Sequence, residues 1–287
     1  MDSTYTQTSA NKSILSLFTR KIVGFITDHL LLILAIVIYM FLFSPIIILI
    51  VYSFNDSQIM TVLTGFTLRW YQTLFQNRDV FSSLTNSLIV GVSSAVISTA
   101  IGTMTAIVLV RHNFWGKQTF STLILAPLIL PEVVLAVALL VFLVFLKIQL
   151  SYFTIIAGHI LLSLPRSTLV VRASAAGLDV TLEEAAADLG ANAWEVFRHV
   201  TFPLLIPGIL ASLLLTFTLS FDNFVITMFV SGVGTTTLPL QIFSMMRFGT
   251  DPQINALGTI LIASNLLLVF AIGGKQLQRV MGGGMQR

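Results

Sequence analysis

The sequence contains no cysteine and few charged residues. Disulfides, thiolate nucleophiles and thiolate metal ligands are therefore excluded. Only 9% of the 287 residues are charged, whereas a soluble domain carries about 25%. With 56% hydrophobic residues, the chain cannot cover a water-facing surface. This composition predicts an integral membrane protein with lipid as its surroundings, and the net charge of +3 gives no indication of nucleic acid as a partner.

Motifs of several enzyme classes are also absent. There is no GxxxxGK[S/T] loop for nucleotide phosphates, and neither HExxH nor GxSxG occurs. The N-terminus is polar and the first apolar run is too long for a signal peptide. An intramembrane enzyme built from Glu132, His159 and Asp222 stays a remote alternative, because these residues lie on three predicted spans without diagnostic spacing.

Six apolar segments are long enough to cross a bilayer, which needs about 20 mainly apolar residues. They are residues 30–54, 84–110, 120–146, 152–171, 204–230 and 254–272. The first contains Pro45 and the third contains Pro127 and Pro131, and such breaks are tolerated where helices or a cavity satisfy the backbone. We expect an all-α membrane domain over residues 30–273, flanked by segments 1–29 and 274–287.

The second span is rich in small and hydroxyl residues. Gly91, Gly102 and the Ser and Thr residues between 93 and 105 are typical of closely packed membrane helices.

Lys and Arg residues predict the orientation. Six spans place both termini on one side, which then holds eleven of the fifteen Lys and Arg residues. Cytoplasmic loops carry such an excess. Both termini and the loop 174–203 between the fourth and fifth spans are therefore expected in the cytoplasm.

That loop predicts two short helices. Thr181 with Glu184, and Asn192 with Glu195, have the spacing of a capping box. Gly190 lies where the end of the first helix needs a left-handed residue. A hairpin that only links two spans would be the simplest interpretation.

The same loop resembles the EAA loop of ABC importer permeases. It contains Glu184-Ala185-Ala186, then Gly190, then Val200-Thr201-Phe202-Pro203, with Val200 and Phe202 in place of the usual Ile and Leu. Pro203 also lies where a new helix could begin. The resemblance implies that the loop fits a groove on a separate ATPase. The expected coupling residues are Glu183, Glu184, Ala185, Ala186, Asp188 and Gly190.

Ionisable residues inside the spans need a reason, because each costs about 2.5–3.5 kcal/mol at bilayer depth. Four ionisable residues stand out, namely Glu132, His159, Arg166 and Asp222, and the amide Asn223 lies next to the last of them. Glu132 or Asp222 could pair structurally with Arg166, or these residues could line a substrate pathway. For His159, a packed and hydrogen-bonded position is favoured over a ligand role.

Several of these residues lie in stretches that resemble the permeases of spermidine/putrescine-type ABC importers. The stretches are Tyr52-Ser53-Phe54-Asn55, Leu130-Pro131-Glu132, Ser220-Phe221-Asp222-Asn223-Phe224, Leu238-Pro239-Leu240 and residues 251–257. The resemblance implies the type I permease fold with six transmembrane helices in a bacterial inner membrane. It also implies three kinds of protein partner: a second homologous permease as a heterodimer, two ATPase subunits that hold ATP and Mg²⁺, and an extracytoplasmic binding protein.

Two departures concern the substrate. Asp222-Asn223 stands where the family often has two acidic residues, and Arg166 places a fixed cation near the pathway. The expected substrate is a polyamine. A zwitterionic or anionic substrate, such as an amino-acid derivative, an opine or an aminophosphonate, is the alternative within the same class. A secondary transporter that works alone is a further alternative, although it would not need a protruding hairpin.

The two outward segments carry less information. Trp70 and Tyr71 are expected in the interfacial aromatic belt. Turn residues from Ser231 onward precede a short amphipathic helix over residues 240–248.

Overall fold

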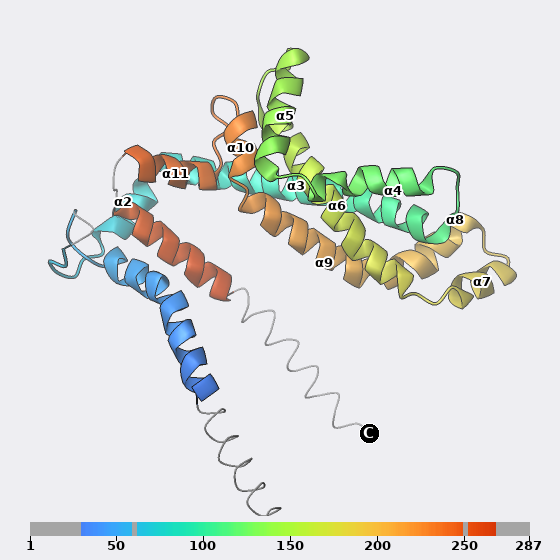
Figure 1. The fold of residues 1–287 in the computed structure, drawn as a ribbon, viewed down its shortest axis with the longest axis horizontal. Coiled ribbons are helices and arrows are strands. Elements are labelled where there is room, and N and C mark those ends of the chain that lie inside the picture. Colours follow the sequence, from blue (N-terminus) through green and yellow to red (C-terminus); the bar gives the residue numbers. More distant parts are fainter. Residues whose placement is uncertain (1–29, 59–61, 249–251, 268–287) are drawn as a thin grey trace, which may run out of the picture. The chain divides into compact units, whose positions relative to one another are not determined.

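The computed structural model describes residues 30–58, 62–248 and 252–267 (Figure 1). Apart from one isolated β-bridge between Asn55 and Phe66, the regular structure in these residues is helical. The all-α class is therefore confirmed. The chain divides into two compact units, which we call the terminal unit (residues 1–73 and 251–287) and the central unit (residues 74–250).

The central unit contains most of the helices. Their bounds are α3 Arg78–Arg111, α4 Lys117–Leu125, η1 Ala126–Leu128, α5 Glu132–Phe145, α6 Tyr152–Ala176, α7 Thr181–Asp188, α8 Ala193–Val196, η2 Phe197–Thr201, α9 Phe202–Phe221, α10 Val225–Val230 and α11 Leu238–Phe248. Helix α2, Arg69–Gln76, runs across the boundary between the units in sequence.

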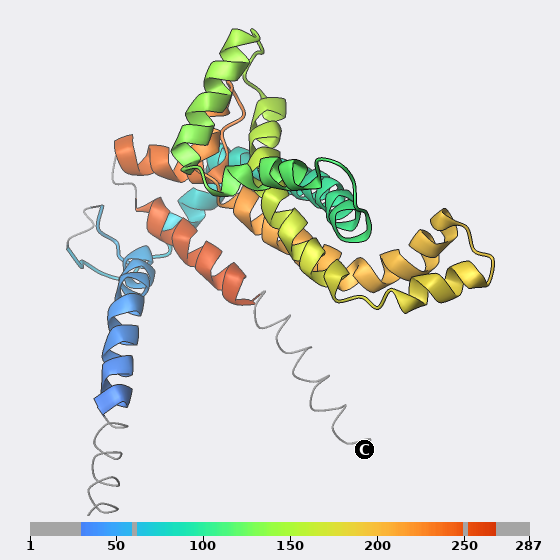
Figure 2. The ribbon, with the colours of Figure 1, turned by 45° about the vertical axis from the view of Figure 1, so that its right-hand side comes forward.

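Helices α3, α6 and α9 lie side by side and form the core of the central unit (Figures 1 and 2). A Cβ atom on Gly102 would lie 2.3 Å from Ser167 Oγ, so α3 and α6 approach too closely for any larger residue there. Ser212 of α9 joins both neighbours through hydroxyl contacts, 2.7 Å to Ser167 and 3.5 Å to Thr99. The close packing predicted for the second span is confirmed.

Two apolar clusters fill the remaining space in this core. The first combines residues of α3, α5, α6 and α10, namely Val90, Ala136, Leu143, Ile155, Leu162, Ile226 and Val230. The second combines Ala106, Val171, Ala175 and Leu205 of α3, α6 and α9. Helix α3 therefore contributes to the core along most of its length.

Four helices in the described residues are long and apolar enough to cross a membrane, namely Leu30–Ser53, Arg78–Arg111, Tyr152–Ala176 and Ala193–Phe221. The predicted third span is broken, because Lys117–Leu128 and Glu132–Phe145 meet at 105°. The predicted fifth span also breaks, between α9 and α10. Of the predicted sixth span, the helix Gln253–Leu267 is described. Residues 268–272 and both flanking segments lie outside the described residues.

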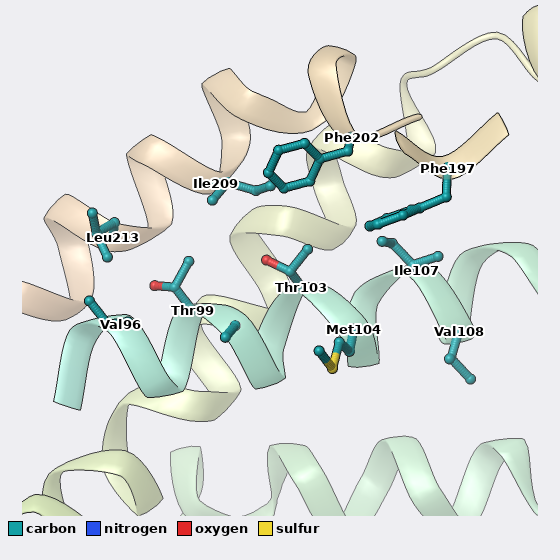
Figure 3. Close-up of a pocket in the computed structure, with 11 residues that line it drawn as sticks. Val96, Thr99, Thr103, Met104, Ile107, Val108, Phe197, Phe202, Ile209 and Leu213 are labelled. Atoms are coloured by element: carbon teal, nitrogen blue, oxygen red, sulfur yellow. The ribbon is translucent and has the colours of Figure 1, made fainter. Parts of the chain in front are cut away.

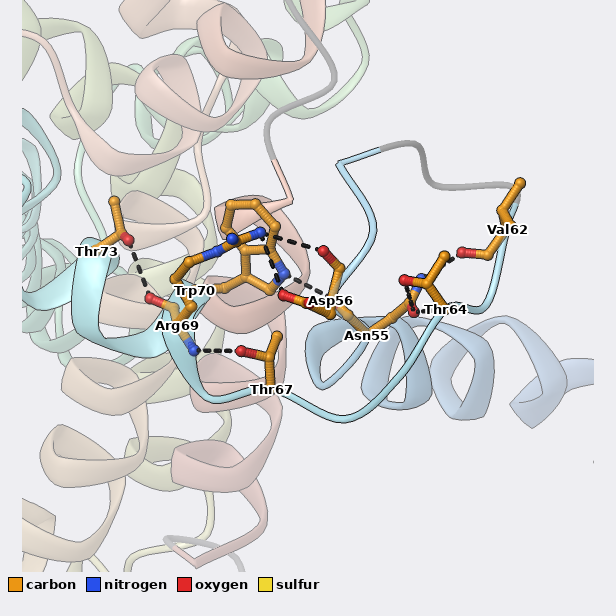
Figure 4. A network of polar contacts seen from close by, with 8 residues as sticks. All are labelled: Asn55, Asp56, Val62, Thr64, Thr67, Arg69, Trp70 and Thr73. Carbon is orange, nitrogen blue, oxygen red and sulfur yellow. Dashed lines mark hydrogen bonds and ion pairs between the residues drawn. The ribbon is translucent and has the colours of Figure 1, made fainter.

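In the terminal unit, Asn55 and Trp70 organise the loop after the first helix (Figure 4). The Asn55 amide donates to Val62 O at 2.6 Å and accepts from Thr64 N at 2.9 Å, while Trp70 Nε1 donates to Asn55 O at 2.7 Å. The Tyr71 hydroxyl lies 2.7 Å from Ser53 Oγ. Trp70 is only 7% exposed and its indole N–H finds a partner inside the protein, while its expected position at the membrane interface stays a prediction.

The segment between α10 and α11 is fixed to the first third of α3. The Asn86 amide donates to Gly234 O at 3.2 Å and to Thr236 O at 2.8 Å, and its oxygen accepts from Tyr152 hydroxyl at 2.6 Å. Ser87 Oγ accepts the first N–H of α11 at 2.8 Å. The predicted short helix is thus present as α11, beginning two residues earlier than expected.

Candidate substrate pocket and coupling hairpin

Glu132 and Asp222 lie at the two helix breaks. Glu132 is the first residue of α5, directly after Pro131, and Asp222 directly follows the last residue of α9. Asn223 connects the breaks, because its Nδ2 donates to Glu132 Oε1 and its Oδ1 accepts from Ile226 N at 3.0 Å. The residues that interrupt the spans therefore also bring polar side chains together, as is typical where broken membrane helices line a cavity.

A pocket of about 310 Å³ opens at this point. Its lining residues are Glu132, Leu162, Arg166, Thr218, Leu219, Asp222, Asn223, Phe224 and Val225. Of the intramembrane residues singled out from the sequence, all except His159 share this pocket. Three predicted spans contribute to it, so its composition depends on their packing.

Arg166 does not pair with the carboxylates of the pocket. Its Nη1 donates to Leu162 O at 2.8 Å, and within the described part of the central unit no ion pair joins it to Glu132 or Asp222. Glu132 instead has the amide of Asn223 as its neutral partner. The structural pairing considered from the sequence is therefore wrong, and the pocket presents charges of both signs.

His159 is buried in the packing of α6 against α9 and α10. Its Nδ1 lies 2.6 Å from Ser220 Oγ and its Nε2 lies 3.0 Å from Thr227 Oγ1, so both ring nitrogens have hydroxyl partners. It does not line the pocket. The packed, hydrogen-bonded position favoured for His159 is confirmed, and we leave it out of the candidate site.

Helices α7 and α8 form the predicted hairpin, at one end of α6 and α9 (Figures 1 and 2). Gly190 has φ +94° and ends α7. Its N–H donates to Ala187 O at 2.9 Å, and Ala191 N donates to Ala186 O at 3.1 Å. This is a Schellman motif, so the role predicted for Gly190 is confirmed.

The start of α8 also follows the prediction. Asn192 N donates to Glu195 Oε2 at 2.8 Å, and Glu195 N donates to Asn192 Oδ1 at 3.1 Å. Both bonds of the capping box are thus present.

The start of α7 differs from the prediction. Thr181 is its first helical residue rather than its cap, and Thr181 N donates to Asp179 Oδ1 at 3.0 Å. This bond holds the pKa of the Asp179 carboxyl below its usual value. The capping box expected from Thr181 and Glu184 is therefore wrong, because a carboxylate two residues upstream satisfies the N–H, and Glu184 stays exposed.

No separate helix begins at Pro203. Residues 193–221 form one continuous helix, and Phe202 N donates to Phe197 O, the spacing of a π-helical turn. The wider turn accommodates Pro203, whose missing N–H and ring would disturb an ordinary α-helical turn. The hairpin is therefore continuous with α9.

The expected coupling residues divide between two faces of α7. Glu184, Ala185 and Asp188 are exposed, as is Gly190 at its end, while Ala186 is half-buried. Glu183 faces the protein instead: its Oε1 accepts from Arg111 Nη2 at 3.0 Å and from Thr201 Oγ1 at 2.9 Å. Large apolar side chains are exposed on the hairpin, including Leu182, Leu189 at 91% and Trp194 at 64%.

An apolar pocket of about 520 Å³ lies beside the junction of the hairpin with α9 (Figure 3). Phe197 faces Ile107 of α3 across it, and Phe202 also lines it. Its charge-free lining offers an amine no counter-charge, so it is not a candidate for the substrate site. In the described residues there is no group of three His, Asp or Glu side chains that could hold a metal ion.

The partners of Glu183 were missed from the sequence. Arg111 counted there only as one of the positive charges, and Thr201 only as part of the loop motif. Thr218 and Phe224 of the pocket were also missed. No local signal marks these residues, because their contacts join segments far apart in the chain.

Comparisons with known proteins agree with this architecture. The family described as "Binding-protein-dependent transport system inner membrane component" matches residues 98–285. The spermidine/putrescine transport system permease protein PotC of Escherichia coli (strain K12) is 40% identical over 234 residues, covering 82% of this chain and 89% of the relative. The putrescine transport system permease protein PotI of the same strain is 38% identical over 233 residues, covering 79% and 83%.

Among solved structures, a bacterial ABC transporter involved in the import of the acidic polysaccharide alginate has a similar fold. The TM-score is 0.66 at 17% identity, with 90% of this chain and 97% of that chain covered. At this identity, the likeness concerns the fold alone. Taken with the family match, it shows that the chain belongs to the binding-protein-dependent transport system inner membrane components, the non-catalytic permease subunits of ABC transporters.

Proposed function

We propose that this permease imports spermidine, putrescine or a related small amine. One observation carries the proposal: Glu132 and Asp222, from two broken spans, line a single pocket. An ammonium group is attracted strongly to carboxylates where the effective dielectric constant is below that of water. The names of relatives 38–40% identical to this chain support the same substrate class.

The helix ends support distinct roles for the two carboxylates. Glu132 lies at the N-terminus of α5, and Asn223 orients its carboxyl group through a hydrogen bond. Asp222 lies at the C-terminus of α9, whose partial negative charge adds to the attraction for a cation. The ring of Phe224 in the same lining can contact an ammonium group through its π face.

In this proposal the exposed face of the hairpin docks on the ATPase. The face comprises Leu182, Glu184, Ala185, Asp188, Leu189 and Trp194. Apolar residues in such a patch favour a protein partner over water. The hairpin and both termini are cytoplasmic, as the excess of Lys and Arg indicates. The assembly would contain a second homologous permease, as a heterodimer, two ATPase subunits that hold ATP and Mg²⁺, and an extracytoplasmic binding protein.

The mechanism follows from that arrangement. ATP-driven approach of the two ATPase subunits would move the docked hairpins, and the helices continuous with them would swing as rigid bodies. Because α8, η2 and α9 are one helix that ends at Phe221, directly before Asp222, a displacement of the hairpin reaches the pocket directly. Access to the pocket would then alternate between the two sides of the membrane.

The substrate proposal is tested by uptake of labelled putrescine into proteoliposomes that contain the complete transporter. Asp222→Asn and Glu132→Gln should each lower uptake about tenfold, which corresponds to about 1.4 kcal/mol of lost attraction. Asp79→Asn, an exposed carboxylate at the start of α3, is the matched control and should transport normally. Unchanged uptake in both pocket variants would overturn the proposal.

A zwitterionic substrate is the second candidate, because Arg166 lines the same pocket. Arg166→Gln separates the two. Uptake of an amine should persist in this variant, since a repelling charge has been removed, whereas uptake of a zwitterion should be abolished with the loss of its carboxylate partner.

The docking proposal can be tested with single cysteines, because the chain contains none. Leu189→Cys should react with a membrane-impermeant maleimide only from the cytoplasmic side and should cross-link to the ATPase. Val233→Cys, exposed in the segment between α10 and α11, is the control and should react from the outside. Labelling of Leu189→Cys from the outside would contradict the assigned orientation. A chain that transports without any ATPase would favour a secondary carrier.

A further inference from the structure

Glu183 forms an ion pair with Arg111 in the central unit. Its Oε1 accepts from Arg111 Nη2 at 3.0 Å and from Thr201 Oγ1 at 2.9 Å. The Arg111 and Glu183 side chains are 16% and 19% exposed, so this pair is much better shielded from water than a surface ion pair. Hydrogen bonds between charged groups are about twice as strong as neutral ones. We call the three residues the Glu183 clamp.

The clamp ties three helices together. Arg111 is the last residue of α3, Glu183 lies in the first turn of α7, and Thr201 is the last residue of η2, which continues into α9. Successive residues of an α-helix point about 100° apart, so Glu183 can face the protein while Glu184 faces solvent. The inward and outward faces of α7 therefore carry different carboxylates.

The connections of α7 along the chain are short non-helical segments. Residues 177–180 join it to α6, and residues 189–192 join it to α8. The second segment contains Gly190, whose backbone is left-handed. If these segments were the only links, they would absorb part of any displacement of α7. The clamp fixes α7 directly to α3, a continuous helix of 34 residues, and to the start of α9.

We propose that Glu183 is a positioning residue that passes the displacement of α7 to α3 and α9, and that it is not part of the surface that docks on the ATPase. This inference rests on the proposed role of the hairpin as the ATPase contact. It separates two functions within one loop: the exposed face of α7 binds the ATPase, and the Glu183 clamp transmits the movement.

The first test measures putrescine transported per ATP hydrolysed by the complete transporter in proteoliposomes. In Glu183→Gln and in Arg111→Gln, assembly with the ATPase and basal ATP hydrolysis should be retained, while this ratio should fall at least about fivefold. A purely structural role would lower assembly, uptake and hydrolysis together. Glu195→Gln, in the exposed cap of α8, is the control on the same hairpin and should keep the ratio.

The exchange of charges provides a rescue. Arg111→Glu combined with Glu183→Arg restores opposite charges, and the ratio in the double variant should exceed that of either reversal alone. Thr201→Val should lower the ratio less than Glu183→Gln, because the ion pair stays. Loss of ATPase assembly in Glu183→Gln would identify Glu183 as a docking residue, and an unchanged ratio in both single variants would show that the clamp transmits nothing. Either result overturns the inference.

A second test needs no substrate, so its failure is distinguishable from failure of the proposed function. Spin labels at Thr181→Cys and Trp115→Cys report the distance between the start of α7 and the segment that follows α3, and both positions are exposed. In the otherwise unchanged chain, this distance should be the same with and without ATP, because α7 and α3 move together. In Glu183→Gln it should change with ATP. A distance that already changes in the unchanged chain would overturn the inference even if polyamines are the substrate.

Discussion

The two ends of α3 are fastened in different ways. Near its start, Asn86 makes three neutral hydrogen bonds to the segment after α10 and to Tyr152, and the side chain is buried. At its last residue, Arg111 makes one ion pair that stays partly exposed. Buried neutral bonds have no water to replace them, whereas a partly exposed charge can exchange its partner for water. The joint at the first end is therefore the more stable one, and the joint at the second end depends on a single charged pair.

The strongest test of this difference is Asn86→Ala. It leaves one hydroxyl donor and two backbone carbonyls without their partner, so the free energy of unfolding should fall by about 3 kcal/mol. Arg111→Gln should lower it by less, about 1.5 kcal/mol, because it removes one charged hydrogen bond and leaves Glu183 its bond from Thr201. Thermal unfolding in detergent measures both. Equal losses would mean that the two joints do not differ in stability.

A second prediction concerns the middle of α3, between the two joints, where this helix packs closely against α6. In Gly102→Ala, the new Cβ would lie 2.8 Å from Ser167 Cβ and 3.1 Å from the Thr168 backbone nitrogen. Such overpacking should cost about 1–3 kcal/mol. Gly91→Ala is the matched control, because its Cβ meets the Phe217 ring at 3.1 Å and a single side chain can adjust. In thermal unfolding, Gly102→Ala should therefore be destabilised more than Gly91→Ala.

Near the second end, Gly190→Ala should weaken the hairpin by about 1–2 kcal/mol, because an L-residue is strained at φ +94°. Gly190→Asn should lose less, since Asn tolerates this region better. Protease cleavage between α7 and α8 measures the effect locally. If Gly190→Ala were no more sensitive than Gly190→Asn, the left-handed turn would not be what holds the hairpin.

The smallest expected effect comes from Asp179. The Thr181 N–H lowers the pKa of its carboxyl, so its contribution to stability is present at neutral pH and is lost as the pH falls through the lowered pKa. The difference in thermal unfolding between the unchanged chain and Asp179→Asn should therefore stay constant from neutral pH down to the ordinary range of aspartate and vanish only below it. A difference that changes near neutral pH would point to another group.

The sequence by itself determined the membrane class, the positions of most helices and several of their ends. The cap of Asn192 and Glu195 and the turn at Gly190 were predicted because their partners lie within a few residues. The break at Pro131 was marked by a residue that interrupts helices, whereas the break at Asp222 was not predicted. Where two caps compete over the same short stretch, as at Asp179 and Thr181, the sequence indicated the wrong one.

Only the tertiary structure decided which polar residues meet. Glu132 and Asn223 are 91 positions apart, and Arg111 and Glu183 are 72 apart, so their contacts depend on how the helices pack and in which register. The same packing placed Arg166 in the pocket without an ion pair to Glu132 or Asp222, and it buried His159 and Trp70. Local patterns specify what a helix can present, but the faces that it turns toward its neighbours are set by contacts that are distant in the chain.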